Sequence, residues 1–150
     1  MTHDTTKVIA MAAGIIALSG IAAWMGLAHG CEQSQGTGVI AGQVTIAPAL
    51  AAKVSTTDVL FVIVRRPQGP PLPIAVKRID GPRFPMSFEI TNNDVMVEGS
   101  GLRGMVNVVA RLDEDGRAGP LQSGGLEGQF AKNPTLVGAR DIEIVINKVY

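Results

Sequence analysis

Hydrophobic residues follow two patterns along the chain: one unbroken run near the start and many short runs afterwards. From residue 39 on, apolar and polar residues alternate over short segments that Gly and Pro interrupt, as is typical of β-strands. The segments expected to form strands are 39–46, 58–66, 72–78, 84–91, 104–112, 121–129 and 141–149. About seven strands joined by tight turns predict an all-β fold, an antiparallel sandwich or barrel.

Two of these segments predict where the core lies. Residues 58–66 (DVLFVIVRR) are almost uniformly apolar, which favours a central strand buried on both faces. Residues 84–91 alternate, and this places Phe84, Met86, Phe88 and Ile90 on one face. Residues 47–54 resemble a helical turn, so the only longer helix we expect lies before residue 39.

The unbroken run, residues 8–28, contains no Asp, Glu, Lys or Arg. An α-helix of that length would be about 31 Å long, close to the ~30 Å hydrocarbon core of a bilayer. We therefore predict a tail at 1–7, a transmembrane helix at 8–28, a linker at 29–38 and a β domain at 39–150. Lys7 precedes the run and the next basic residue is Lys53, so the positive-inside rule puts the N-terminus in the cytoplasm. The expected location is a single-pass inner (cytoplasmic) membrane protein with a periplasmic β domain.

Other fates of the N-terminal run stay open. Ala28-His29-Gly30 has the small-x-small form of a signal-peptidase site, so the run could be a cleaved signal. Cys31 could carry a lipid, although Leu27 stands one place too far from it for a lipoprotein signal.

One face of the expected helix carries small residues. Ala10, Gly14 and Ala17 are spaced four and three residues apart, which lets another helix approach closely. We interpret this face as a helix-packing site and expect integral membrane proteins among the partners.

Composition and charge exclude several functions. The formal net charge is zero, and no basic face of the kind that nucleic acid requires is visible in the sequence. Asp113-Glu114-Asp115-Gly116 resembles the start of a calcium loop, but Gly124 stands where its last ligand is required, so a charged turn is favoured. His29 and Cys31 supply too few ligands for a metal site.

The β domain also lacks the residues of common catalytic sites. It contains no His and no Cys, and no carboxylates are grouped as acid–base catalysis requires. We expect no enzyme activity, no cofactor and no small-molecule substrate. Two basic pairs, Arg65-Arg66 and Lys77-Arg78, could bind an acidic partner, although solvated basic residues at strand ends are the more common interpretation.

Several longer segments resemble a known family. They are GQVTIAPALAAKV (42–54), LFVIVRRPQGPPLPIAVKR (60–78), FPMSFEI (84–90), VNVVARLDEDGRAGPLQSGGLEGQ (106–129) and IEIVINKV (142–149). In order and spacing they resemble the C-terminal periplasmic domain of cytochrome c-type biogenesis proteins of the CycH kind. The resemblance implies a part in handling apocytochrome c before haem ligation. Members of that family typically carry two transmembrane helices and tetratricopeptide repeats, whereas in these 150 residues we expect one helix and no helical repeats.

Two functions follow from these observations. The first is a non-catalytic, membrane-anchored accessory subunit of a respiratory or electron-transfer complex that contains c-type cytochromes. The alternative is a cytochrome c maturation factor that binds apocytochrome c, with an exposed edge strand pairing with an extended peptide. The expected partners are therefore integral membrane proteins and c-type cytochrome proteins.

Overall fold

The structure, a computed structural model, describes residues 38–70, 72–97, 99–114, 116–117 and 123–150. The predicted tail, the transmembrane helix and residues 29–37 of the linker lie outside these ranges. The described residues include no helix long and apolar enough to cross a membrane. The expectations for residues 1–37 therefore stay predictions.

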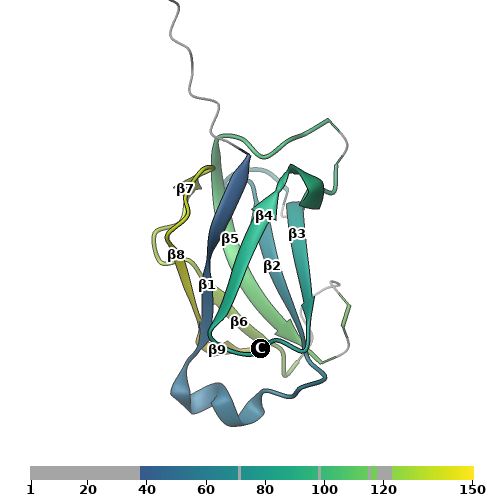
Figure 1. Cartoon of the computed structure of the whole chain (residues 1–150), viewed down its shortest axis with the longest axis vertical. Helices are drawn as coiled ribbons and strands as arrows, with labels where there is room; N and C mark the ends of the chain where they lie inside the picture. The colour runs from purple at the N-terminus through teal and green to yellow at the C-terminus, as the bar shows by residue number, and fades with distance from the viewer. Residues whose placement is uncertain (1–37, 71, 98, 115, 118–122) are drawn as a thin grey trace, which may run out of the picture. The chain divides into compact units, whose positions relative to one another are not determined.

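The described residues form a β domain of two sheets with short 3-10 helices between strands (Figure 1). Its elements are β1 (Val39–Ile46), η1 (Pro48–Lys53), β2 (Val59–Arg65), β3 (Pro73–Asp80), β4 (Met86–Thr91), η2 (Asn92–Asp94), β5 (Met105–Asp113), β6 (Leu126–Gln129), β7 (Thr135–Leu136), β8 (Ile142–Ile146) and β9 (Lys148–Val149). The all-β prediction is confirmed, and so are the strand at 39–46 and the helical turn after it.

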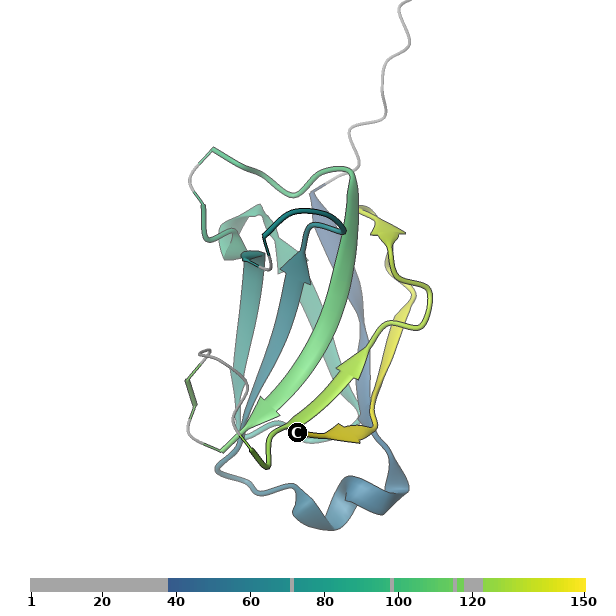
Figure 2. The ribbon, with the colours of Figure 1, turned by 180° about the vertical axis from the view of Figure 1, so that it is seen from behind.

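The first sheet has the strand order β4-β1-β8, and the second has the order β3-β2-β5-β6-β9, with β7 pairing with the start of β5. Figure 2 shows the second sheet from its outer side. The expectation of a wholly antiparallel fold is wrong at one place, because β1 and β8 run parallel, with Gly42 opposite Ile142. Alternation along each strand is the same in either pairing, so the sequence pattern did not distinguish them.

The predicted last strand, 141–149, is also wrong as a single element. The chain leaves the first sheet after Ile146, and Lys148 and Val149 pair with β6 in the second sheet. The backbone of Asn147, between the two strands, donates a hydrogen bond to the carbonyl oxygen of Glu127 over 3.1 Å. One segment thus joins both sheets along this side of the domain.

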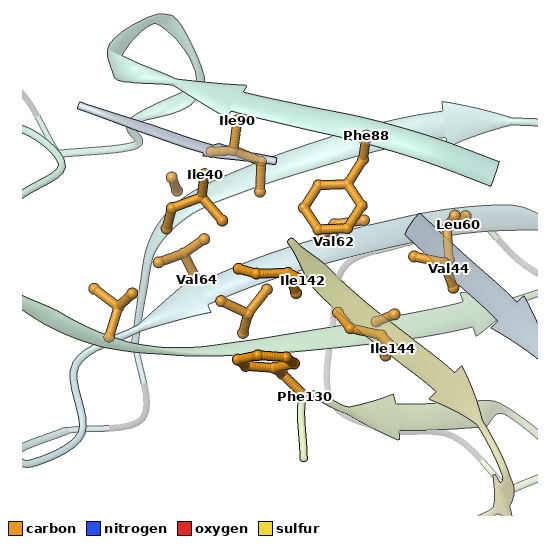
Figure 3. Close-up of a cluster of buried hydrophobic side chains, with 14 of the residues drawn as sticks. Ile40, Val44, Leu60, Val62, Val64, Phe88, Ile90, Phe130, Ile142 and Ile144 are labelled. Carbon is orange, nitrogen blue, oxygen red and sulfur yellow. The ribbon is translucent and has the colours of Figure 1, made fainter. Parts of the chain in front are cut away.

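The core lies between the two sheets (Figure 3). Alternate residues of the strands face inward, so Ile40, Leu60 and Ile144 meet there with no exposed surface. Burying such a side chain stabilises the fold by about 1.5–3 kcal/mol. The apolar segment in β2 is buried on both faces, as predicted. Val59, Phe61 and Ile63 form a second, smaller cluster on the outer side of the sheet.

Glycine permits two close approaches between neighbouring strands. A Cβ at Gly42 would lie 1.9 Å from the carbonyl oxygen of Ile142, and a Cβ at Gly128 would lie 2.2 Å from that of Val145. The first contact brings β8 against β1, and the second brings β6 over β8 from the other sheet. No larger residue fits at either position without moving backbone.

Candidate functional site

The sequence-predicted helix-packing residues Ala10, Gly14 and Ala17 lie outside the described residues, as do His29 and Cys31. The acidic segment at 113–116 is partly described. Asp113 ends β5 instead of opening a turn, and its carboxylate accepts a 2.7 Å hydrogen bond from Arg111. Among the described residues no three His, Cys, Asp or Glu side chains gather as metal ligands.

Three of the four residues in the two predicted basic pairs form ion pairs or hydrogen bonds within the domain. Lys77 forms an ion pair with Asp94 over 3.0 Å, and Arg78 one with Asp80 over 2.8 Å. Arg66 donates a hydrogen bond to the carbonyl oxygen of Arg103 over 2.8 Å. The Lys77–Asp94 pair connects β3 of one sheet to η2, which follows β4 of the other. The charges of Lys77 and Arg78 are therefore paired within the domain, whereas Arg66 bonds to a neutral backbone oxygen and stays exposed.

The outer face of the larger sheet carries a polar cluster that the sequence analysis missed. Arg111 and Asp113 stand two residues apart on β5, and Glu127 lies opposite Arg111 on β6; all three are buried. The Tyr150 hydroxyl donates a 2.8 Å hydrogen bond to Glu127. The sequence signal was the alternation in residues 111–113 (RLD) and 126–128 (LEG), which turns the charged residues to the face opposite the core residues Leu112 and Leu126.

Backbone hydrogen bonds also hold Tyr150, the last residue of the chain, in place. Its N–H donates to the carbonyl oxygen of Gly125 over 2.9 Å, and its carbonyl oxygen accepts from Gly124. The side-chain hydrogen bond to Glu127 raises the pKa of the phenol above its usual value of 10.0, and partial burial and the negative charge of Glu127 act in the same direction. This cluster fixes the C-terminus and leaves its charges facing one another, so we assign it a structural role.

A groove runs over the outer face of the smaller sheet. It has a volume of about 610 Å³ and is lined by β1, β4, the start of β8 and the two residues before it. Ala41 forms its floor because its side chain is small, with Glu89 opposite it on β4, while Gln43 and Ser87 stand opposite one another further along. The hollow thus lies over Ala41 on the central strand, beside the longer Glu89 of β4.

The groove is mainly acidic. Glu89, Asp141 and Glu143 line it, and Arg140 is the basic residue beside them. Arg140 donates to Glu89 over 3.4 Å, but both side chains are more than half exposed, so the pair contributes little to stability. The groove therefore presents exposed carboxylates to a cationic or hydrogen-bond-donating ligand.

The free edge of β4 borders this groove. Ala41 N–H donates to the carbonyl oxygen of Ala139, so the backbone groups of Ala41 point toward β8. Successive residues of a strand point their backbone groups to opposite sides, so Gly42 bonds to Phe88 on β4. Glu89, one residue further on, then directs its N–H and carbonyl oxygen away from β1.

The same argument applies to Ser87, the other outward-directed residue of β4. At Thr91, two residues past Glu89, the edge closes, because Thr91 N–H donates to the Asp94 carboxylate over 2.8 Å. No backbone partner of Ser87 or Glu89 is found in the part of the chain that the structure describes. These residues offer donors and acceptors at the spacing that an added strand requires.

The edge of β3, in the larger sheet, is better protected. The first half of β3 is covered by Val95, which bridges to Ala75, and the second half carries Lys77, Arg78 and Asp80. Lys77 is turned toward the interior, and an inward charge on an edge strand opposes pairing with another strand. The β4 edge and its groove are therefore the best candidate site for binding a polypeptide.

Comparison with known proteins identifies a family. A family model described as the Ig-like domain of cytochrome c-type biogenesis protein H matches residues 40–147. Cytochrome c-type biogenesis protein CycH of Pseudomonas aeruginosa is 35% identical over 78 residues, which are 51% of this chain and 19% of that protein. The chain thus spans about a fifth of the length of that relative.

Two further proteins are similar to this chain. An uncharacterized protein of Aquifex aeolicus is 30% identical over 111 residues, 74% of this chain and 71% of its own length. An alternative pilotin from the type II secretion system of Vibrio cholerae is 17% identical, with a TM-score of 0.45 over 73% of this chain and 96% of its own. The pilotin likeness is too distant to carry an argument. The family model covers most of the β domain, and the chain belongs to the family of Ig-like domains of cytochrome c-type biogenesis protein H.

Proposed function

We propose that the chain is a non-catalytic factor of cytochrome c biogenesis that holds an extended segment of apocytochrome c. The observation that carries this proposal is the family match over residues 40–147, together with the relative named CycH. Both favour the maturation factor over the accessory subunit of a respiratory complex. The match covers the β domain, so the proposal assigns the binding role to that domain.

The binding mode follows from the edge of β4. An apocytochrome segment adds as a strand beside Ser87 and Glu89, and backbone hydrogen bonds supply most of the affinity. Its alternate side chains lie along the border of the groove, where exposed carboxylates favour Lys or Arg. Such a site accepts many peptide sequences, because backbone hydrogen bonds do not depend on which side chains the peptide carries. A factor that serves several apocytochromes needs that tolerance.

The chain is proposed to act at the outer surface of the cytoplasmic membrane. Residues 8–28 anchor it with the N-terminus in the cytoplasm, and the short linker keeps the β domain near the bilayer, in the periplasm. Support for this arrangement comes from the uncharged run and from the position of Lys7 before it.

A proline at position 89 tests the binding mode. Glu89→Pro removes the outward N–H and breaks no bond to β1, so an edge strand should tolerate it. We expect synthetic apocytochrome c peptides to shift the amide resonances of β4 in the wild-type chain and to bind Glu89→Pro about tenfold more weakly. Glu89→Gln is the control, because it keeps the N–H and removes only the charge.

The two variants separate the two contributions. A loss of affinity confined to Glu89→Pro indicates backbone pairing, whereas an equal loss in both indicates that the charge alone attracts the peptide. Unchanged binding in both, with unchanged thermal unfolding, would show that the peptide site is elsewhere.

The accessory-subunit hypothesis rests on the small residues Ala10, Gly14 and Ala17 in the expected helix. A chain that packs permanently against another membrane helix should remain with it in mild detergent. Purification through a tag after Tyr150 then yields a haem-stained complex of fixed composition. Migration of the chain alone counts against this second candidate and leaves the maturation role standing.

A further inference from the structure

Large exposed apolar side chains gather at one end of the β domain. Leu72 is 71% exposed, Met96 62% and Val97 55%, and Met105 and Leu136 are also exposed. All five lie in or next to the connections at the end where β3 and β5 begin (Figure 1). We call this region the apolar end.

Strand register brings these connections together. Arg65, the last residue of β2, lies opposite both Pro73 of β3 and Asn107 of β5. Met105 pairs with Leu136 on β7, and Val97 lines a hollow of about 210 Å³ together with Leu72. The exposed residues therefore form neighbouring parts of one surface.

The connection that carries Met96 and Val97 is held firmly at both sides. Val95 bridges to β3, and Met96 N–H donates to the carbonyl oxygen of Ile74 over 2.8 Å. On the far side Leu102 is buried, and its N–H donates to the Asn92 side chain over 2.9 Å. Two apolar residues are thus held in solvent on a fixed support, an arrangement that marks an interaction surface.

Basic side chains flank the apolar end. Arg66 and Arg103 are both exposed, and the hydrogen bond from Arg66 to the Arg103 carbonyl oxygen fixes the two segments together. Apolar side chains beside Arg suit a surface that rests on a bilayer, because the guanidinium groups can meet lipid phosphates while the apolar groups enter the interface.

The chain also enters the domain at this end. Val39, the first residue of β1, accepts a hydrogen bond from Gly138 N–H, and Val137 N–H donates to Gly104 just before β5. The predicted transmembrane run ends at Ala28, about ten residues earlier, and a fully extended linker of that length reaches at most about 35 Å. The apolar end is thus the part of the domain closest along the chain to the proposed anchor.

We propose that the apolar end rests on the membrane surface, with Leu72, Met96 and Val97 in the interfacial layer and Arg66 and Arg103 at the phosphates. This contact orients the domain, so that the β4 edge stands beside the bilayer at a fixed height and the C-terminus points away. The inference rests on the proposed anchoring of the chain but not on the proposed binding of apocytochrome c.

Spin labels test the contact on the full chain. A Cys31→Ser background carries a single nitroxide at Met96→Cys or, as control, at Val149→Cys, in vesicles of equal parts phosphatidylcholine and phosphatidylglycerol. Val149 is exposed too, but pairs with Leu126 at the opposite end of the domain. We expect the ratio of oxygen to nickel-chelate accessibility to be several-fold higher at position 96, because oxygen concentrates in lipid.

A second comparison tests whether the apolar side chains, and not the nitroxide label itself, bring position 96 into the lipid. Leu72→Ser with Val97→Ser, both at exposed positions, should return the accessibility ratio at position 96 to that at 149. Equal ratios at both positions in the unaltered background overturn the proposal, even when the chain floats with the vesicles. A label at 96 shielded from both reagents indicates a protein partner and overturns it as well. A chain that does not float with the vesicles overturns both the anchor and the contact.

Discussion

Gly128→Ala tests how the two sheets are joined. In the native chain β6 crosses close to β8, and a Cβ at position 128 would lie 2.2 Å from the carbonyl oxygen of Val145 and 2.8 Å from the Cα of Ile146. Cβ atoms in proteins essentially never come closer than 3.0 Å to another heavy atom, so one strand must move by about 1 Å. Both contacted atoms belong to backbone, so no side-chain rotation relieves the collision.

The expected loss of stability follows from these contacts. Inserting a methyl group into a well-packed site typically costs about 1–3 kcal/mol, and two backbone contacts favour the upper part of that range. Replacing Gly by Ala also lowers the conformational entropy of the unfolded chain, which offsets this loss of stability by about 0.4–1 kcal/mol. The net destabilisation should be about 2 kcal/mol. With a urea slope of about 1–2 kcal/mol per molar for a domain of this size, the unfolding midpoint falls by about 1–2 M.

Urea unfolding of residues 35–150, followed by far-ultraviolet circular dichroism, measures this shift. The control is Gly69→Ala, because Gly69 has a φ of +101° and a Cβ there would have no other atom within 4 Å, so this variant reports backbone strain without a collision. We expect Gly128→Ala to be the more damaging substitution by at least about 1 kcal/mol. Equal midpoints for the two variants, or a Gly128→Ala variant as stable as wild type, would refute the close approach of β6 and β8.

Three further predictions concern the core, the C-terminus and the N-terminal run. Val62→Asp should unfold the domain by placing a charge at a site with no exposed surface, a loss of about 4 kcal/mol or more in thermal melts, whereas Val145→Asp on the exposed outer face should change stability by less than about 1 kcal/mol. Tyr150, the sole tyrosine, should titrate above pH 10.0 when followed by near-ultraviolet absorbance, and Glu127→Gln should lower its pKa. Because the pKa of Tyr150 is raised in the folded state, its hydrogen bond to Glu127 stabilises the fold fully below the pKa of the unfolded state, and this stabilisation is lost as pH rises through the pKa of the folded state. Gly14→Ile should weaken co-purification with a membrane partner and leave the melting of the β domain unchanged; equal recovery would make the helix a tether alone.

Periodicity predicted the strands of this domain better than their partners. The alternation that put Phe88 and Ile90 on one face is confirmed by their burial, and the apolar run around Val62 is indeed a central strand. Pairing depends on contacts between distant residues, which a local pattern does not record. This is why the parallel pairing of β1 with β8 and the division of the last strand at Asn147 were not predicted.

The kind of binding site could be predicted from the sequence, but its position in the fold could not. An exposed edge strand for peptide binding was expected, but identifying β4 required the direction of the backbone groups of Ala41 and Glu89. The groove depends on Ala41 lying opposite Glu89, and that register is set by pairing. The burial of Asp113, expected in a solvated turn, followed from its ion pair with Arg111, two residues back on the same strand.

The most direct test of the central claim is the set of c-type cytochromes in cells that lack this chain. Haem-stained membranes of a deletion strain should lose many c-type cytochromes together, and the wild-type chain should restore them while Glu89→Pro restores them poorly. Loss of the cytochrome of a single complex, with the others at wild-type levels, would contradict a role in biogenesis and support the accessory subunit instead.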